Sequence, residues 1–269
     1  MINERIEGLK FLDQDSIEFI SRGEGNTPVF VYSQKFLEVQ AQKALAMPNA
    51  YGLTVRYAMK ANPNGALLRI FDREGIHIDA SSEYEVERAV RAGIDPKKIL
   101  LTTQQLPRTF KNKFMSDVEV NLTSLNQIED YANFTDYYGA FYRGNKVSIR
   151  INPGLGSGGT NRTNVGGPSS SFGIWHEEFD EAMEMLKKYG FNVKRLHSHI
   201  GSGSDPEVWK KVAGMTLAYG EKLLATNHNL EIVNLGGGYK VGRMNDEETT
   251  DLYECGKVVV KSFEDFYSK

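Results

Sequence analysis

One lysine ends an apolar segment of the chain, and this position gives its amine a chemical use. Lys60 is the last residue of Thr54–Lys60, which reads TVRYAMK. If this segment is a strand, its flanking residues prevent the ammonium from reaching the outer surface. The ammonium is then expected to lie in the opening at the end of the sheet. Loss of hydration there lowers the pKa of a lysine and makes it a candidate nucleophile. The alternative is a lysine that extends to solvent at a strand end, and the residue taken alone favours that alternative.

A run of three glycines follows another apolar segment. Gly236, Gly237 and Gly238 come after the letters IVNL. Because they carry no side chains, their backbone N–H groups can approach a phosphate closely. A tight turn would account for one or two glycines but seldom for three, so the run favours a phosphate-binding loop.

A third segment, HSHIGSG over residues 197–203, brings imidazoles and a hydroxyl to a strand end. His197 and His199 share one face of a strand, so one of the two alone is expected to touch a ligand. Ser202, between two glycines, could bind a phosphate oxygen. A lone histidine is more often a hydrogen-bonded core residue.

Charged side chains end two further segments. Asp79 in IDASS and the nearby Glu85 would bring carboxylates to the same opening. Arg150 lies between isoleucines in IRINP, and a buried arginine needs an anionic partner. A salt bridge to Asp79 or Glu85 would supply that partner and is compatible with a functional role. A nucleophilic lysine, a phosphate cradle and a stacking imidazole together favour pyridoxal 5'-phosphate, a phosphorylated aldehyde that is held as a Schiff base.

Seven apolar or β-branched segments must position these side chains. Stretches with helical spacing separate them, such as Glu83–Ala92 and Glu177–Tyr189, and each of these two stretches is followed by a glycine, as left-handed helix caps are. Strand then helix, repeated along the chain, predicts a parallel sheet with crossover helices. The expected strands, of which the fourth has the weakest pattern, are Thr54–Lys60, His77–Ser82, Ile99–Thr103, Glu119–Ser124, Val147–Pro153, Arg195–Gly201 and Ile232–Gly238.

Chemistry spread over many strand ends favours an α/β fold of the (β/α)8 TIM-type barrel class, whose active site is built from all the loops after its strands. A doubly wound sheet gathers its ligand at one switch point instead, and the sequence has neither a Rossmann nor a Walker A glycine pattern. Pro28–Ser33 is expected to form an extra strand, after a helix near Asp15–Arg22. The long segment Gly154–Phe172 is interpreted equally well as a functional loop or as a plain surface loop.

The composition restricts the class of protein. The 269 residues are 40% hydrophobic and 25% charged, which excludes a disordered chain. A single cysteine fits a reducing compartment, and no run of about 18 apolar residues predicts a membrane span. The N-terminal letters MINERIEGLKF lack the apolar core of a signal peptide. A net charge of -3 with scattered Lys and Arg gives no footprint for nucleic acid. A cytoplasmic enzyme or small-molecule binder is therefore expected.

In chain order, the segments YAMKAN, IDASSEYE, RINPG, HSHIGSG and NLGGGY resemble the motifs of the barrel-type, fold-III pyridoxal-phosphate-dependent decarboxylases, most closely the diaminopimelate decarboxylases. Any one motif is weak, but the ordered set is specific. The resemblance extends from Thr27 to Tyr239, which is most of the chain.

The resemblance implies roles for the residues singled out above. Lys60 would hold the cofactor as a Schiff base and His199 would stack on its ring, so these two are the expected catalytic residues. No metal site is implied. The cofactor-binding residues would be Lys60, Asp79, Glu85, Arg150, His199, Ser202, Gly236, Gly237 and Gly238.

Three features depart from the family pattern. The family continues with an eighth strand and a C-terminal β domain, which would begin where this chain ends, after Phe266–Lys269. We therefore expect a barrel truncated before its eighth strand, with two unpaired strand edges. Residues 1–33 would associate with the β domain, and residues 34–269 would form the barrel. Cys255 does not match the position of the family's cysteine. The long loop closes with Ser171 where the family usually has lysine, although its length favours the diaminopimelate branch over the ornithine branch.

The implied activity is the decarboxylation of an amino acid, meso-diaminopimelate to L-lysine in the leading interpretation, by an enzyme that is a homodimer in its full-length form. Ornithine, arginine or a carboxylated polyamine are alternative substrates. A barrel that binds pyridoxal phosphate without turnover is an alternative of a different class. Racemisation is less favoured, because HSHIGSG and the glycine run follow the decarboxylase pattern.

Overall fold

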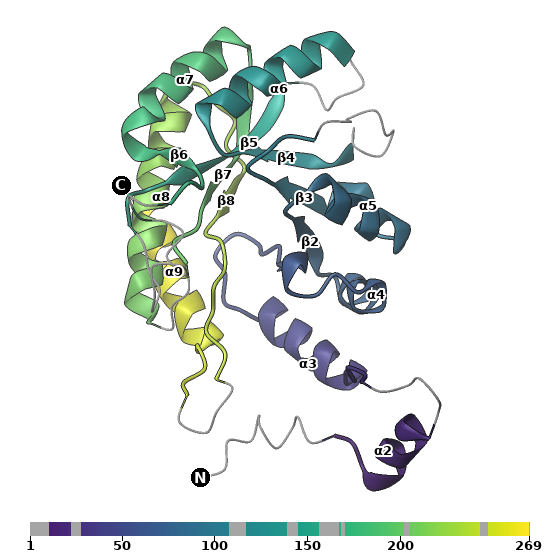
Figure 1. Cartoon of the computed structure of the whole chain (residues 1–269). Coiled ribbons are helices and arrows are strands. Elements are labelled where there is room, and N and C mark those ends of the chain that lie inside the picture. Colours follow the sequence, from purple (N-terminus) through teal and green to yellow (C-terminus); the bar gives the residue numbers. More distant parts are fainter. Residues whose placement is uncertain are drawn as a thin grey trace.

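Parallel strands form one sheet that curls into most of a barrel (Figure 1). The computed structural model describes residues 11–22, 28–107, 117–138, 145–155, 167, 170–201, 205–242 and 247–268. Neighbouring strands follow the order β1-β2-β3-β4-β5-β7-β8, and β6 pairs with β5 beside this path. The strands are β1 (Arg56–Ala58), β2 (His77–Ala80), β3 (Ile99–Thr102), β4 (Glu119–Leu122), β5 (Lys146–Asn152), β6 (Ile174–Trp175), β7 (Asn192–Ser198) and β8 (Ile232–Asn234).

All seven strands predicted for the barrel are present, including the weakly patterned fourth one, which forms β4. Each pairs in parallel with the strands next to it in the path. Among the described strands, β1 pairs only with β2, and β8 only with β7. The barrel is therefore open between β1 and β8, as the sequence predicted.

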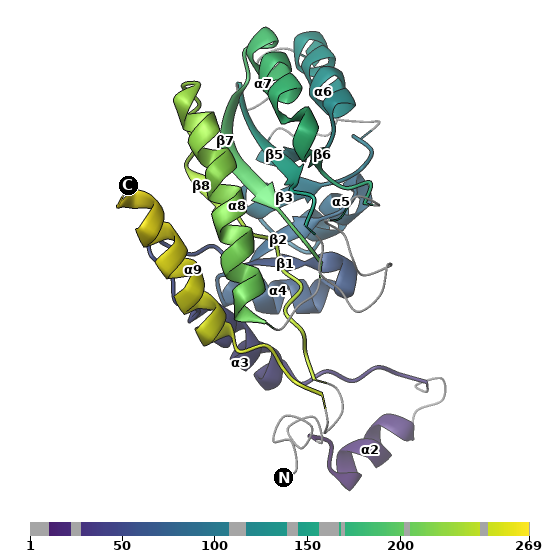
Figure 2. The ribbon, with the colours of Figure 1, turned by 90° about the vertical axis from the view of Figure 1, so that its left-hand side faces the viewer.

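Helices cover the outer face of the curled sheet (Figures 1 and 2). Several begin at a side chain that accepts a backbone N–H, such as Asn64, Ser82 and Asp205, which is the usual N-cap chemistry. No helix in the described part of the chain is long and apolar enough to cross a membrane. The helices are α2 (Gln14–Ser21), α3 (Gln34–Leu45), α4 (Gly65–Arg73), α5 (Glu83–Arg91), α6 (Leu125–Tyr138), α7 (Phe179–Lys188), α8 (Pro206–Ala225) and α9 (Leu252–Tyr267), with 3-10 turns η1 (Met59–Ala61), η2 (Pro96–Lys98) and η5 (His176–Glu178).

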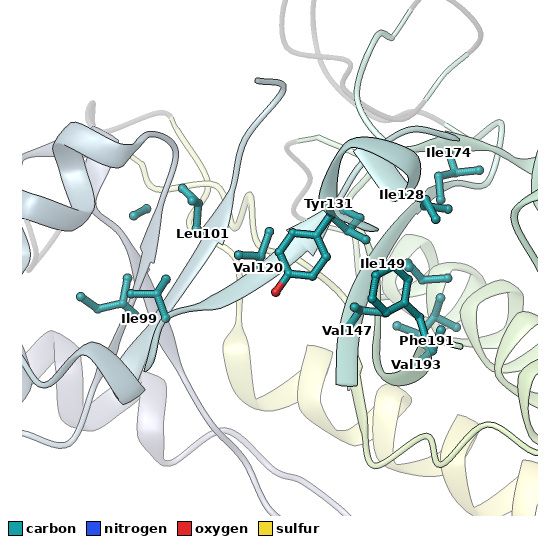
Figure 3. Close-up of a cluster of buried hydrophobic side chains, with 14 of the residues drawn as sticks. Ile99, Leu101, Val120, Ile128, Tyr131, Val147, Ile149, Ile174, Phe191 and Val193 are labelled. Carbon is teal, nitrogen blue, oxygen red and sulfur yellow. The ribbon is translucent and has the colours of Figure 1, made fainter. Parts of the chain in front are cut away.

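The main core lies between the sheet and these helices (Figure 3). Alternate residues of a strand face opposite sides of a sheet, and here one set is apolar. Val147 and Ile149 of β5 belong to this buried cluster, together with Tyr131 of α6. The Tyr131 ring lies 5.7 Å from that of Phe191, just before β7. The other set of strand residues therefore faces the barrel interior, where it is free to be polar.

The N-terminal segment stands apart from the barrel (Figures 1 and 2). The helix expected near Asp15–Arg22 is α2, and none of its residues is buried. The strand expected over Pro28–Ser33 is not formed, and Phe30 within it is 87% exposed. That prediction was wrong because β propensity makes a strand only where a partner edge is present, and no described residue pairs with this segment.

Candidate active site

Polar residues from adjacent strands meet inside the barrel because the sheet register places them side by side. Thr102 of β3 pairs with Asn121 of β4, and Asn121 pairs with Ser148 of β5. Arg150, two residues further along β5, pairs with His197 of β7. All five side chains are buried. These polar side chains therefore come from consecutive strands of the sheet.

Asp79 of β2 is the inward-facing carboxylate at this end of the barrel. Thr102 Oγ1 donates a hydrogen bond to Asp79 Oδ1 over 3.0 Å. Burial raises the pKa of Asp79 above its ordinary value, although this hydrogen bond and the charges of Arg56, Lys60 and Arg150 act in the opposite direction. Two of the predicted site residues, Lys60 and Arg150, are thus close enough to Asp79 to act on its charge.

Arg150 is a guanidinium held inside the barrel, with 6% of its surface exposed. Burial lowers its pKa to about 10, and the charge of Asp79 acts in the opposite direction. The guanidinium carbon also lies 4.9 Å from the centre of the Phe172 ring, a cation–π contact. Of the two carboxylates that the sequence left open as partners of Arg150, Asp79 is the one whose charge acts on it.

Lys60 lies in the 3-10 turn η1, directly after β1. Its side chain is exposed. Of the two interpretations of Lys60, this exposure fits the lysine that extends to solvent at a strand end rather than the desolvated ammonium. The strand ends at Ala58, two residues earlier than expected, and Lys60 follows it in the turn, where its charge still acts on Asp79 and His199.

Glu85 has a local structural function. Its Oε2 accepts the Ser81 N–H over 2.7 Å, and its own N–H is donated to Ser82 Oγ over 3.2 Å. Ser82 is thus the N-cap of α5, and the Glu85 carboxylate binds the N–H one residue before the cap, a variant of the capping box. Glu85 therefore holds the turn that follows Asp79, and one of its carboxylate oxygens is committed to that cap.

His199 packs against the glycine run. The Gly237 N–H donates to His199 Nδ1 over 3.3 Å. Gly236 has a φ of +73°, and a Cβ at that residue would lie 2.5 Å from His199 Nδ1. Burial, together with the charges of Arg150 and Lys60, lowers the pKa of His199 to about 3, so the imidazole is neutral at physiological pH. The glycine run and the imidazole thus form one fitted unit.

The two histidines of HSHIGSG have different neighbours, and the expectation that one of them alone touches a ligand stays a prediction. His197 is buried, and its Nδ1 lies 2.7 Å from Asn121 Nδ2. Burial lowers the pKa of His197 well below its ordinary value. Ser202 and most of the Gly154–Phe172 segment lie outside the described residues.

Cys255 lies on α9 and is fully buried. Burial, with smaller contributions from nearby acidic side chains, raises the pKa of its thiol to about 11. The thiol is therefore protonated at neutral pH, which makes it a poor nucleophile.

The sequence did not single out Thr102, Asn121 or Ser148. All three are uncharged polar residues in predicted strands, and each occupies a position that faces inward. The alternation of apolar and polar residues along the strands was the available signal, since apolar residues flank Asn121 and Ser148 and so indicate that these two face the opposite side of the sheet. That the three side chains lie next to one another follows only from the pairing register of β3, β4 and β5.

The chain matches the family model described as the pyridoxal-binding domain of pyridoxal-dependent decarboxylases over residues 37–269. It is 32% identical over 223 residues to the diaminopimelate decarboxylase of Streptomyces coelicolor, a match that covers 81% of this chain and 47% of that one. The diaminopimelate decarboxylase of Methanothermobacter thermautotrophicus is 31% identical over 261 residues, or 95% of this chain and 59% of that one.

A crystal structure of diaminopimelate decarboxylase superposes with a TM-score of 0.77 at 26% identity, covering 91% of this chain and 56% of that one. The incomplete barrel seen here therefore corresponds to part of a known barrel fold. The chain spans about half the length of the curated relatives it matches.

We predict that Gly236→Ala destabilises the chain by about 1–3 kcal/mol, because a Cβ there is strained by the positive φ and meets His199. Gly237→Ala is the matched control, since a Cβ at residue 237 meets no atom within 4 Å. Its effect should stay within about 0.5 kcal/mol. Urea unfolding of both variants measures the difference, and equal stabilities would contradict the fit between His199 and the loop.

The His199 imidazole should also shape the pH dependence of stability. Its pKa is about 3 in the folded chain against 6.5 ordinarily, so below pH 6.5 the unfolded chain binds a proton that the folded chain does not. Stability therefore falls as the pH falls from 6.5 toward 3. We predict that His199→Gln makes this acid limb shallower, by on the order of a few kcal/mol across the window. An acid limb of unchanged slope in urea titrations would show that His199 is not buried as described.

Proposed function

Because the chain belongs to the pyridoxal-dependent decarboxylases, we propose that the complete protein uses pyridoxal phosphate to decarboxylate a diamino acid. The leading case is the conversion of meso-diaminopimelate to L-lysine. One observation carries the proposal: the amine of Lys60, the unit formed by His199 and the glycine run, and the charges of Asp79 and Arg150 lie at one end of the barrel. The curated relatives named above support the choice of substrate.

The described residues are chemically suited to a phosphorylated aldehyde. At Gly236 there is no room for a Cβ against His199, whereas Gly237 borders open space, so the loop leaves its backbone accessible on one side. The cations Lys60 and Arg150 outnumber the inward-facing carboxylate of Asp79, which favours an anionic ligand. An exposed lysine amine stands at the rim for the aldehyde.

Each residue has a distinct task in this proposal. Lys60 Nζ would bind the aldehyde carbon, and His199, being neutral, would pack against the ring without adding positive charge. The loop of Gly236, Gly237 and Gly238 would hold the phosphate, with Ser202 as a further donor. The Gly236 and Gly237 N–H groups, which donate here to Asn234 Oδ1 and His199 Nδ1, would exchange those acceptors for phosphate oxygens. When bound, pyridoxal phosphate supplies an electron-withdrawing ring that weakens the bond to the substrate's carboxylate.

Asp79 and Arg150 would set the charge beside the ring. Arg150 is fixed by burial and by the Phe172 contact, so it presents a cation that is already desolvated. The hydrogen bond from Thr102 keeps Asp79 in a defined orientation. Glu85 would act on the site through the Ser81–Ser82 turn that it caps.

The organisation of the complete protein is part of the proposal. Residues 1–33 would associate with a second, β-rich domain, and the exposed apolar side chains of this segment, such as Phe19 and Phe30, support that assignment. The homodimer rests on the family resemblance. The cytoplasmic location rests on the single cysteine of the chain.

Reductive trapping tests the cofactor site directly. The chain is incubated with pyridoxal phosphate and reduced with borohydride, and the modified lysine is identified by peptide mapping. We expect a pyridoxyl group on Lys60, because its exposed amine stands beside the proposed phosphate loop. Lys60→Ala should abolish this labelling, whereas Lys97→Ala, at an exposed lysine in η2, should retain it.

The same experiment on the full-length protein completes the test. Labelling of Lys60 there, with carbon dioxide released from meso-diaminopimelate, supports the full proposal. Release from ornithine, arginine or a carboxylated polyamine instead would correct the substrate. Labelling without release from any of them would indicate a non-catalytic barrel. Absence of label on Lys60 in both forms would overturn the cofactor site.

A further inference from the structure

Asn121 stands at the centre of a buried hydrogen-bonded row that crosses the barrel interior. Its side chain is fully buried. Ser148 Oγ donates to Asn121 Oδ1 over 2.9 Å, and Asn121 Nδ2 donates to Thr102 Oγ1 over 3.2 Å. The same Nδ2 atom lies 2.7 Å from His197 Nδ1. Both polar atoms of this amide are therefore engaged, in three contacts with three different strands.

The direction of each hydrogen bond follows once Asp79 is ionised. An ionised carboxylate can only accept, so the single hydroxyl proton of Thr102 then points to Asp79 Oδ1. Thr102 Oγ1 must then accept from Asn121, which requires the amide nitrogen rather than the oxygen on that side. The orientation of the Asn121 amide is thus fixed by chemistry.

The same orientation fixes the state of His197. An amide nitrogen can only donate, so His197 Nδ1 must be an unprotonated acceptor. The imidazole then carries its proton on Nε2 and is neutral, which agrees with its full enclosure in the barrel. A change in the ionisation of Asp79 would therefore alter the hydrogen bonding of His197 through the two intervening side chains, Thr102 and Asn121.

We propose that Asn121 is a positioning residue that couples the charge of Asp79 to the tautomer of His197 through the Thr102 hydroxyl. The row favours the ionised form of Asp79, because the Thr102 hydroxyl donates to it, and it keeps His197 neutral. It thereby links the charges of these two residues, separately from the buried ion pair of Arg195 and Glu119. The proposal concerns the residues alone and goes beyond the proposed function, since it holds whether or not a cofactor is bound.

The tautomer of His197 tests the coupling. Histidine-labelled chain is examined by ¹⁵N NMR at neutral pH, and the His197 signals are assigned by their loss in His197→Gln. We expect Nδ1 unprotonated and Nε2 protonated in the parent chain. Asn121→Asp replaces the donor with an acceptor, so Nδ1 should move to the protonated region. Asn152→Asp is the matched control, a buried asparagine of β5 that bonds Gly154 and Gly167 instead, and it should keep the parent pattern.

A second pair of variants tests the link through Thr102 and remains informative if Asn121→Asp fails to fold. Thr102→Val keeps the shape of the side chain but removes the hydroxyl, which frees the amide to adopt both orientations. His197 should then show both tautomers, and the carboxyl pKa of Asp79, followed by ¹³C NMR, should rise. Thr102→Ser keeps the hydroxyl and should retain a single tautomer. A protonated Nδ1 in the parent chain, or a single unchanged tautomer in Thr102→Val, would overturn the proposal.

Discussion

A guanidinium buried inside the barrel constrains the groups around it. Arg150 has little contact with water, so its charge must be offset within the protein, and Asp79 is the inward-facing carboxylate whose charge acts on it. Asp79 is itself buried, and burial raises the pKa of its carboxyl. The hydrogen bond from Thr102 and the nearby cations oppose this effect. The polar interior depends on a charge balance that no single residue can maintain.

The same balance explains why the two histidines are neutral. A further positive charge beside Arg150 would be costly, and the pKa values of His197 and His199 are both lowered by burial and by that guanidinium. The Nδ1 atom of His197 is hydrogen-bonded by the Asn121 side chain, and the Nδ1 atom of His199 by the Gly237 N–H. The steric fit of His199 to Gly236 then ties the imidazole to the loop proposed to hold the phosphate.

The sequence predicted the strands, their order and the residues at their ends because alternation and glycine runs are local signals. It left the exposure of Lys60 open, since exposure depends on where the strand stops and on what packs over the turn. It assigned Glu85 to the cofactor, which stays a prediction, but it did not predict the hydrogen bond that the Glu85 carboxylate accepts from the Ser81 N–H just before α5. Asn121 was missed because its importance comes from register, which places it between Thr102 and Ser148. The strand expected over residues 28–33 lacked a partner among the described residues.

The central claim is that this barrel end is a binding site for pyridoxal phosphate. A crystal structure of the full-length protein soaked with pyridoxal phosphate tests it most directly. We predict the phosphate at the loop of Gly236, Gly237 and Gly238, with the Gly236 and Gly237 N–H groups donating to it instead of to Asn234 Oδ1 and His199 Nδ1. The ring should lie against His199 and the aldehyde carbon at Lys60 Nζ. Pyridoxal phosphate bound elsewhere, with this end of the barrel unchanged, would contradict it.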